Sequence, residues 1–124
     1  MSFDLAVWYP SKQLTDKEAG DLYLQLCEGI VDDVMPHEAI NNFYLEITSL
    51  HPEIDDVPEH EIGNFDVSPW SVAFDRSPGH LIMCCVWSKA EYVEELVIKT
   101  ALKHSLAIYN PQTSQYLLPG TKEN

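Results

Sequence analysis

The side chains best suited to chemistry in this sequence are carboxylates, and they gather in one segment. Residues 51–70, HPEIDDVPEHEIGNFDVSPW, contain three prolines and no lysine or arginine. The six acidic residues of this segment are Glu53, Asp55, Asp56, Glu59, Glu61 and Asp66. Such a concentration of negative charge can bind a cation, catalyse acid–base chemistry or attract a basic partner.

Metal binding is one interpretation of this segment. His51 and His60 lie among the carboxylates, and oxygen-rich clusters suit calcium or magnesium. The spacing does not match an EF-hand loop, because the glycine is misplaced and no acidic residue closes the loop at its twelfth position. Zinc patterns such as CxxC and HExxH are absent from the sequence. We therefore predict no metal and no cofactor, with a metal-dependent hydrolase or small-ligand-binding domain as the alternative function.

Catalysis by these carboxylates would require burial or a close neighbour that raises one pKa. Acids placed between prolines, with few large apolar residues near them, are expected to be solvated instead. The GxSxG, phosphate-loop and dinucleotide-binding glycine patterns are absent. Cys84 and Cys85 lie in an apolar run, which predicts buried and unreactive thiols. We therefore expect no catalytic residues and no enzyme activity.

Charge is distributed unevenly along the chain. The net charge is -13, and residues 18–75 hold fourteen of the twenty acidic residues and no lysine or arginine. Such a field repels nucleic acid and anionic membranes but attracts a cationic protein, so we expect a basic protein partner. For Trp70, burial in the core is the expectation and exposure at the interface is the alternative. The predicted partner-binding residues are Asp55, Asp56, Glu59, Glu61, Asp66, Glu53, Asp32, Asp33 and Trp70.

The length of 124 residues predicts one domain, and the hydrophobic content of 45% is enough for a folded core. The longest apolar run, residues 81–87, is far shorter than the roughly 20 residues that span a bilayer. No secretory signal is visible, and the three cysteines are odd in number, which together predict a reduced, cytoplasmic protein. We expect one domain over residues 1–118, an acidic loop at 51–69 and a flexible tail at 119–124.

The first half of the chain predicts one strand and two helices. Residues 3–9 are rich in β-forming side chains and are closed by a proline, which indicates a strand. Thr15 and Glu18 have the spacing of a capping box and predict the start of a helix. A second helix is expected to carry Pro36 in its first turn and to end before Pro52.

The second half begins with a predicted hairpin. Residues 70–74 and 80–87 have the composition of strands, and DRSPG at 75–79 supplies turn chemistry between them. The second of these strands is apolar on both faces, as expected for a central strand that is covered by other elements.

A third helix is predicted from a second capping box at Ser88 and Glu91, followed by a strand at 106–109 and an edge extension at 115–118. The order of elements predicts an α+β fold. We expect a single antiparallel or mixed sheet of about four strands, with three helices packed mainly on one face. This topology resembles a ferredoxin-like split βαβ arrangement whose first crossover is expanded to two helices.

Four short motifs carry a resemblance to a known group of proteins. They are MSFDLAVWY at the N-terminus, SPW at 68–70, VWS at 86–88 and LAIYNPQ at 106–112. Together they resemble small acidic bacterial proteins found with polymorphic or contact-dependent growth inhibition toxins, whose members resemble immunity proteins. The resemblance implies a cytoplasmic protein that binds a cognate toxin domain and blocks it, and it transfers no catalytic residue. A nuclease toxin is expected, because a groove that holds phosphates is basic and attracts carboxylates.

Overall fold

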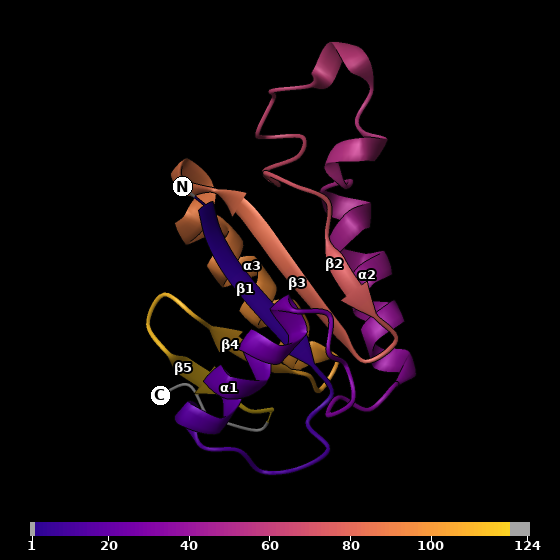
Figure 1. Cartoon of the computed structure of the whole chain (residues 1–124). Helices are drawn as coiled ribbons and strands as arrows, with labels where there is room; N and C mark the ends of the chain where they lie inside the picture. The colour runs from indigo at the N-terminus through magenta and orange to yellow at the C-terminus, as the bar shows by residue number, and fades with distance from the viewer. Residues whose placement is uncertain (1, 120–124) are drawn as a thin grey trace.

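The computed structural model describes residues 2–119, which form an α+β fold with one antiparallel five-stranded sheet and three α-helices (Figure 1). The strands are β1 (Ser2–Trp8), β2 (Asp75–Ser77), β3 (His80–Val86), β4 (Ala107–Asn110) and β5 (Gln115–Leu117), in the spatial order β2-β3-β1-β4-β5. The helices are α1 (Asp16–Cys27), α2 (Glu38–Leu50) and α3 (Ala90–Lys103). No helix among the described residues is long and apolar enough to cross a membrane.

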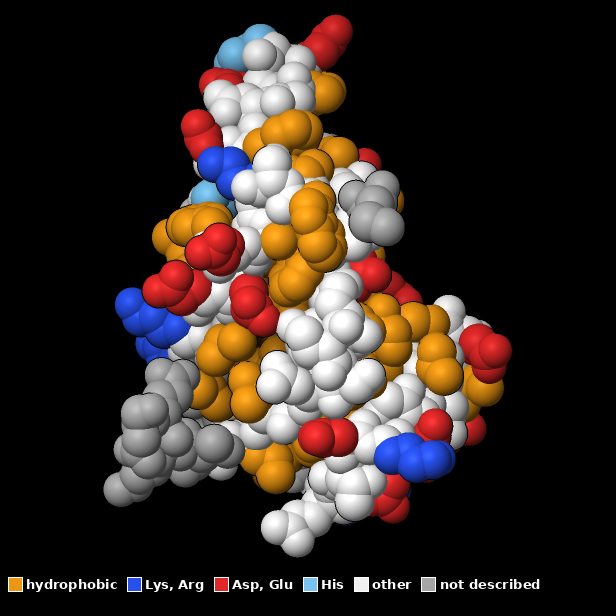
Figure 2. Space-filling view, turned by 90° about the vertical axis from the view of Figure 1, so that its left-hand side faces the viewer, with side chains coloured by type: hydrophobic (Ala, Val, Ile, Leu, Met, Phe, Trp, Pro, Cys, Tyr) orange, Lys and Arg blue, Asp and Glu red, His pale blue; other side chains and the backbone are white. Residues whose placement is uncertain are grey.

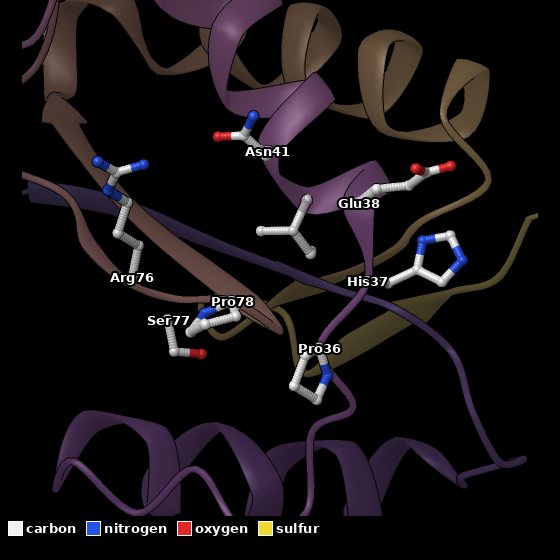
Figure 3. Close-up of a pocket in the computed structure, with 8 residues that line it drawn as sticks. Pro36, His37, Glu38, Asn41, Arg76, Ser77 and Pro78 are labelled. Atoms are coloured by element: carbon white, nitrogen blue, oxygen red, sulfur yellow. The ribbon is translucent and has the colours of Figure 1, made fainter.

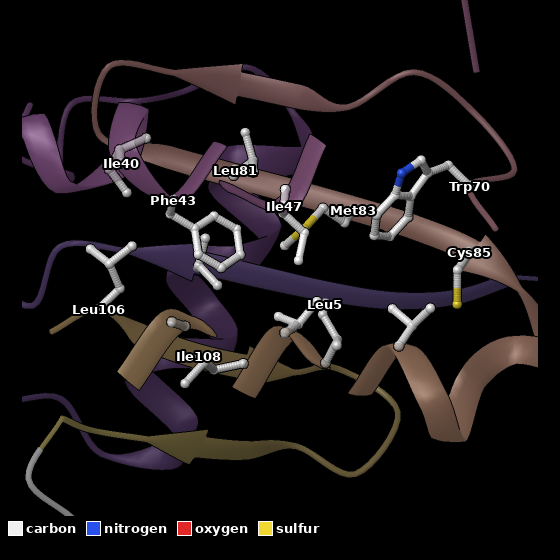
Figure 4. Close-up of a cluster of buried hydrophobic side chains, with 14 of the residues drawn as sticks. Leu5, Ile40, Phe43, Ile47, Trp70, Leu81, Met83, Cys85, Leu106 and Ile108 are labelled. Carbon is white, nitrogen blue, oxygen red and sulfur yellow. The ribbon is translucent and has the colours of Figure 1, made fainter. Parts of the chain in front are cut away.

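The central strands divide their side chains between two cores. Successive side chains of a strand point to opposite faces, so Leu5 and Val7 of β1 belong to one buried cluster and Ala6 and Trp8 to the other. Helices α2 and α3 cover the first face, where Phe43 packs with the apolar side chains of β1 and β3 (Figure 4).

Helix α1 covers the second face and buries Ala19, Leu22 and Leu26 in the same cluster as Trp8. The expectation that the helices lie mainly on one face is therefore met by α2 and α3 and is wrong for α1. The physical reason is that both faces of β1 and β3 are apolar, so the second face also needs a cover.

The start and end of α1 follow from local sequence. The hydroxyl of Thr15 accepts a hydrogen bond from the Glu18 N–H at 3.1 Å, and the Glu18 carboxylate accepts one from the Thr15 N–H at 2.9 Å. This capping box confirms the predicted helix start. Beyond the helix, Gly29 has a φ of 83°, a left-handed conformation that glycine adopts without a steric cost.

Two predicted helix starts are wrong. Helix α2 begins at Glu38 and not at Pro36, because the His37 ring caps it by accepting a hydrogen bond from the Ala39 N–H at 3.0 Å. The second predicted capping box does not form, since η3 (Trp87–Lys89) is a 3-10 turn and α3 starts after it with no side-chain cap.

The predicted hairpin is present, but its first strand is displaced along the sequence. Strand β2 occupies residues expected to form the turn, and the connection narrows to Pro78 and Gly79. Within residues 70–74 only Trp70 pairs with the sheet, through an isolated bridge to Cys85. The tail predicted at 119–124 lies outside the described residues except for Pro119.

Candidate functional site

The acidic segment, residues 51–69, leaves the C-terminal end of α2 and projects beyond the sheet before it returns to β3 (Figure 1). It contains two short 3-10 helices, η1 (Ile54–Asp56) and η2 (Glu59–Glu61), joined by turns. The segment is thus a series of hydrogen-bonded turns, and its prolines restrict the backbone φ angle where they occur.

Hydrogen bonds at the base of the acidic segment hold its two ends together. The ring of the buried His51 lies 3.0 Å from the Val67 carbonyl through Nδ1 and 2.7 Å from the Tyr92 hydroxyl through Nε2. The Ser68 hydroxyl donates to the Pro52 carbonyl at 2.8 Å. Because the outgoing and returning ends are joined in this way, the rest of the segment is presented on a fixed support.

Trp70 belongs to this support and not to the surface. Its side chain is 1% exposed, and its indole N–H donates to the His51 carbonyl at 2.9 Å. The ring packs edge-on against Phe74 with 4.8 Å between centroids. Burial of Trp70 is confirmed, and the alternative of an exposed interface residue is wrong, because the indole N–H finds its partner inside the fold.

Glu53 is also engaged internally. One carboxylate oxygen accepts a hydrogen bond from the Tyr44 hydroxyl, and the other accepts one from the Phe74 N–H at 2.9 Å. The hydrogen bond to Glu53 raises the pKa of Tyr44, with burial as the second cause. Glu53 therefore joins α2 to the strand region ahead of β2, and its carboxylate is not free for a partner.

The exposed charge of the segment lies on η1 and η2. Asp55, Asp56 and Glu59 are exposed, and none forms an ion pair with a lysine or arginine of residues 2–119. Glu61 is half-buried and accepts a hydrogen bond from the Asn64 side chain at 3.1 Å. This part of the molecule consequently presents uncompensated negative charge to the solvent.

Asp66 differs from these residues because it forms an ion pair with Lys89. The hydrogen bond from the Lys89 ammonium lowers the pKa of Asp66, and the attraction between the two charges acts in the same direction. Lys89, from the second half of the chain, therefore neutralises Asp66, one of the carboxylates predicted to bind the partner.

Asp32 and Asp33 are not brought to the acidic segment. They lie in the turn between α1 and α2, ahead of the first residue of α2, whereas the acidic segment starts after its last residue. A helix of 13 residues spans roughly 20 Å, so this distance separates the two groups of carboxylates along the helix axis.

Exposed hydrophobic side chains accompany the acidic ones, and the sequence analysis missed them. Ile62 is 64% exposed and Phe65 is 42% exposed on the acidic segment, and Trp87 and Tyr92 are 53% and 49% exposed on the η3–α3 region that contacts it. Figure 2 shows hydrophobic side chains gathered below the projecting part of the molecule, with acidic side chains around them. The available signal was the presence of two large apolar side chains, Ile62 and Phe65, between the carboxylates of the segment.

The described residues bring together no group of three or more histidine, cysteine, aspartate or glutamate side chains that could hold a metal ion. Burial raises the pKa of the Cys84 thiol to about 12 and that of Cys85 to about 11, as expected for an apolar strand. Cys27, by contrast, is exposed.

One serine and one histidine lie within hydrogen-bond distance in the β2–β3 hairpin. The Ser77 hydroxyl is 2.6 Å from Nδ1 of His80 and accepts a hydrogen bond from the Gly79 N–H at 3.2 Å. Nε2 of His80 lies 3.6 Å from an Asp75 oxygen. The hydroxyl is engaged within the turn and the ring is 1% exposed, so we assign these contacts to stabilisation of the hairpin.

Comparisons with protein-family models, with curated proteins and with solved structures found no match to this chain.

Proposed function

We propose that this chain is an immunity protein that binds a cognate bacterial toxin domain, a nuclease, and occludes its basic active site with the acidic segment. The observation that supports this proposal is the exposure of Asp55, Asp56 and Glu59, without a basic partner, on a segment whose base is clamped by His51 and Ser68. A fixed array of carboxylates can replace the phosphates that a nuclease groove is built to hold.

The charges and the hydrophobic side chains have different roles in this proposal. Exposed carboxylates steer a basic partner and can raise association rate constants to about 10⁸–10⁹ M⁻¹s⁻¹ at low salt, but they add little affinity each. Buried aromatic and aliphatic anchors supply most of the binding energy of an interface. We assign this anchoring role to Phe65, Ile62, Trp87 and Tyr92, and we leave Trp70 and Glu53 out of the interface.

The remaining features of the proposal concern location and fold. The protein acts in the cytoplasm, where a nuclease toxin meets its substrate, and it binds neither nucleic acid nor membrane. We also propose that the sheet is a ferredoxin-like split βαβ arrangement, because β3 lies between β1 and β2 while two helices connect those two strands.

Binding and growth protection test this function together. The test uses a toxin domain encoded next to this chain, expressed with and without it. We expect the chain to restore growth and to bind this domain by calorimetry. The variant in which Asp55, Asp56, Glu59 and Glu61 become Asn or Gln should bind at least about tenfold more weakly at low salt.

A matched control separates the position of the charge from its amount. Glu28, Asp32, Asp33 and Glu38 are all exposed between the end of α1 and the first residue of α2, outside the acidic segment, and their replacement by Gln or Asn also removes four charges. We expect this control to bind the toxin domain nearly as well as the wild type. If both variants bind the toxin domain equally weakly, the interface is not localised on the acidic segment. Stoichiometric binding of calcium, magnesium, manganese or zinc to this chain would favour the hydrolase alternative.

A further inference from the structure

A cavity of about 660 Å³ lies between the N-terminal end of α2 and the β2–β3 hairpin (Figure 3). Small-molecule sites in proteins fall in the range of about 300–1,000 Å³ and combine apolar walls with a few polar groups. The walls here have that composition, with apolar side chains from Pro36, Ile40 and Pro78 and polar ones from Asn41 and Arg76.

Arg76 is the single arginine of the chain, and its surroundings leave it available to a ligand. Its guanidinium carbon lies 3.8 Å from the centroid of the Tyr44 ring, a cation–π contact that holds the group beside the ring. The Tyr44 hydroxyl is in turn held by Glu53. Arg76 forms no ion pair with a carboxylate of residues 2–119, although the chain contains twenty acidic residues.

The charges around the cavity favour the binding of an anion at the end where Arg76 lies. In Figure 3 the amide oxygen of Asn41 faces the guanidinium of Arg76, and Glu38 lies at the opposite end with its carboxylate directed away from Arg76. An anion at the Arg76 end would therefore meet the guanidinium donors from β2, and the apolar side chain of Ile40 also lines the cavity.

We propose that this cavity binds a small carboxylate with an apolar body, independently of the toxin-docking function. The planar guanidinium presents two parallel N–H groups that match a carboxylate in a bidentate pair. Pro36, Ile40 and Pro78 cover the apolar body. A doubly charged phosphate fits less well, because a single cation faces it in a molecule of net charge -13.

Paired probes test the carboxylate requirement. Phenylacetate and phenylacetamide have nearly the same shape, and only the first carries a charge. We expect phenylacetate to bind with a Kd on the order of 1 mM, as befits a ligand of this size. Phenylacetamide should bind at least about tenfold more weakly, since it lacks the bidentate ion pair. Backbone amide NMR shifts should concentrate at residues 37–41 and at Arg76 and Ser77.

Variants of the cavity give the second arm of the experiment. Arg76→Gln should abolish the difference between the two probes, whereas Arg76→Lys should keep part of it because the charge remains without the fork. Lys99→Gln, an exposed cation on α3, is the matched control and should behave as the wild type. An amide spectrum with wild-type dispersion verifies that each variant is folded.

Equal affinity for the two probes, shifts confined to other parts of the molecule, or an unchanged preference in Arg76→Gln would overturn the proposal. Absence of binding by phenylacetate at concentrations of about 20 mM, well above the expected Kd, would overturn it as well. Because the probes contain no protein, none of these results depends on the toxin partner, and the docking function stands or falls separately.

Discussion

Replacement of Glu53 provides a sharp test of how the acidic segment is attached to the fold. Its carboxylate accepts hydrogen bonds from the Tyr44 hydroxyl and the Phe74 N–H, whereas Asp55, two residues later, is exposed and has neither contact. The two residues carry the same charge in the same segment. A difference in their effect on stability therefore measures the hydrogen bonds and not the charge.

The expected magnitude follows from the two bonds. A hydrogen bond to a charged group contributes about 1.5–3 kcal/mol, and the half-buried position of Glu53 favours the lower value. Glu53→Ala should lower the free energy of unfolding by about 2–4 kcal/mol, because the Phe74 N–H also loses its partner. Glu53→Gln should cost about 1 kcal/mol, since the amide can still accept from Phe74 and donate to Tyr44. Asp55→Ala should change stability by less than about 0.5 kcal/mol.

Urea unfolding followed by tryptophan fluorescence measures these differences. With an m-value of about 2 kcal/mol/M, Glu53→Ala should shift the midpoint by about 1–2 M while Asp55→Ala leaves it nearly unchanged. Combining Glu53→Ala with Tyr44→Phe should give less than the sum of the single effects, because both changes remove the same bond. A midpoint for Glu53→Ala equal to that of Asp55→Ala would refute the assignment of Glu53 to the support.

The remaining predictions concern cysteine reactivity and pH. Iodoacetamide at about pH 8 should modify the exposed Cys27 first, while Cys84 and Cys85 react only after unfolding, because burial raises the pKa of both thiols. Peptide mass spectrometry measures the order of labelling, and early labelling of Cys84 would contradict this prediction. Burial lowers the pKa of His80 against the opposing effect of Asp75, so the unfolded state binds the proton more readily. The wild type should therefore be more stable than His80→Asn by an amount that is fully present above about pH 6.5 and that declines as the pH falls below this value. A difference in urea midpoints that does not change with pH would show that His80 is not buried as a neutral ring.

Local sequence signals were sufficient for some elements and insufficient for others. The capping box of Thr15 and Glu18 predicts the start of α1 because all its partners lie within four residues. The Ser88–Glu91 pattern has the same spacing but forms no cap, because the chain tightens into a 3-10 turn at Trp87–Lys89 as it leaves β3. The apolar character of both faces of β3 already implied covers on both sides, which the placement of α1 provides.

The division of the acidic segment into structural and exposed carboxylates could not be read from the sequence. Glu53 and Asp55 are chemically alike, and only the Tyr44 side chain of α2 and the backbone of Phe74 distinguish them. The pairing of Asp66 with Lys89 likewise joins residues that are distant along the chain. Contacts of this kind depend on the tertiary fold, whereas charge content and proline placement are visible in the sequence alone.

The salt dependence of toxin binding tests the central claim most directly. Wild-type affinity for the proposed toxin domain should fall at least about tenfold between about 50 mM and about 500 mM salt, because screening weakens exposed charge pairs. The variant that lacks the charges of Asp55, Asp56, Glu59 and Glu61 should lose most of this dependence, while the control variant that lacks four charges between α1 and α2 keeps it. Equal salt dependence of wild type and of the acidic-segment variant would contradict the account.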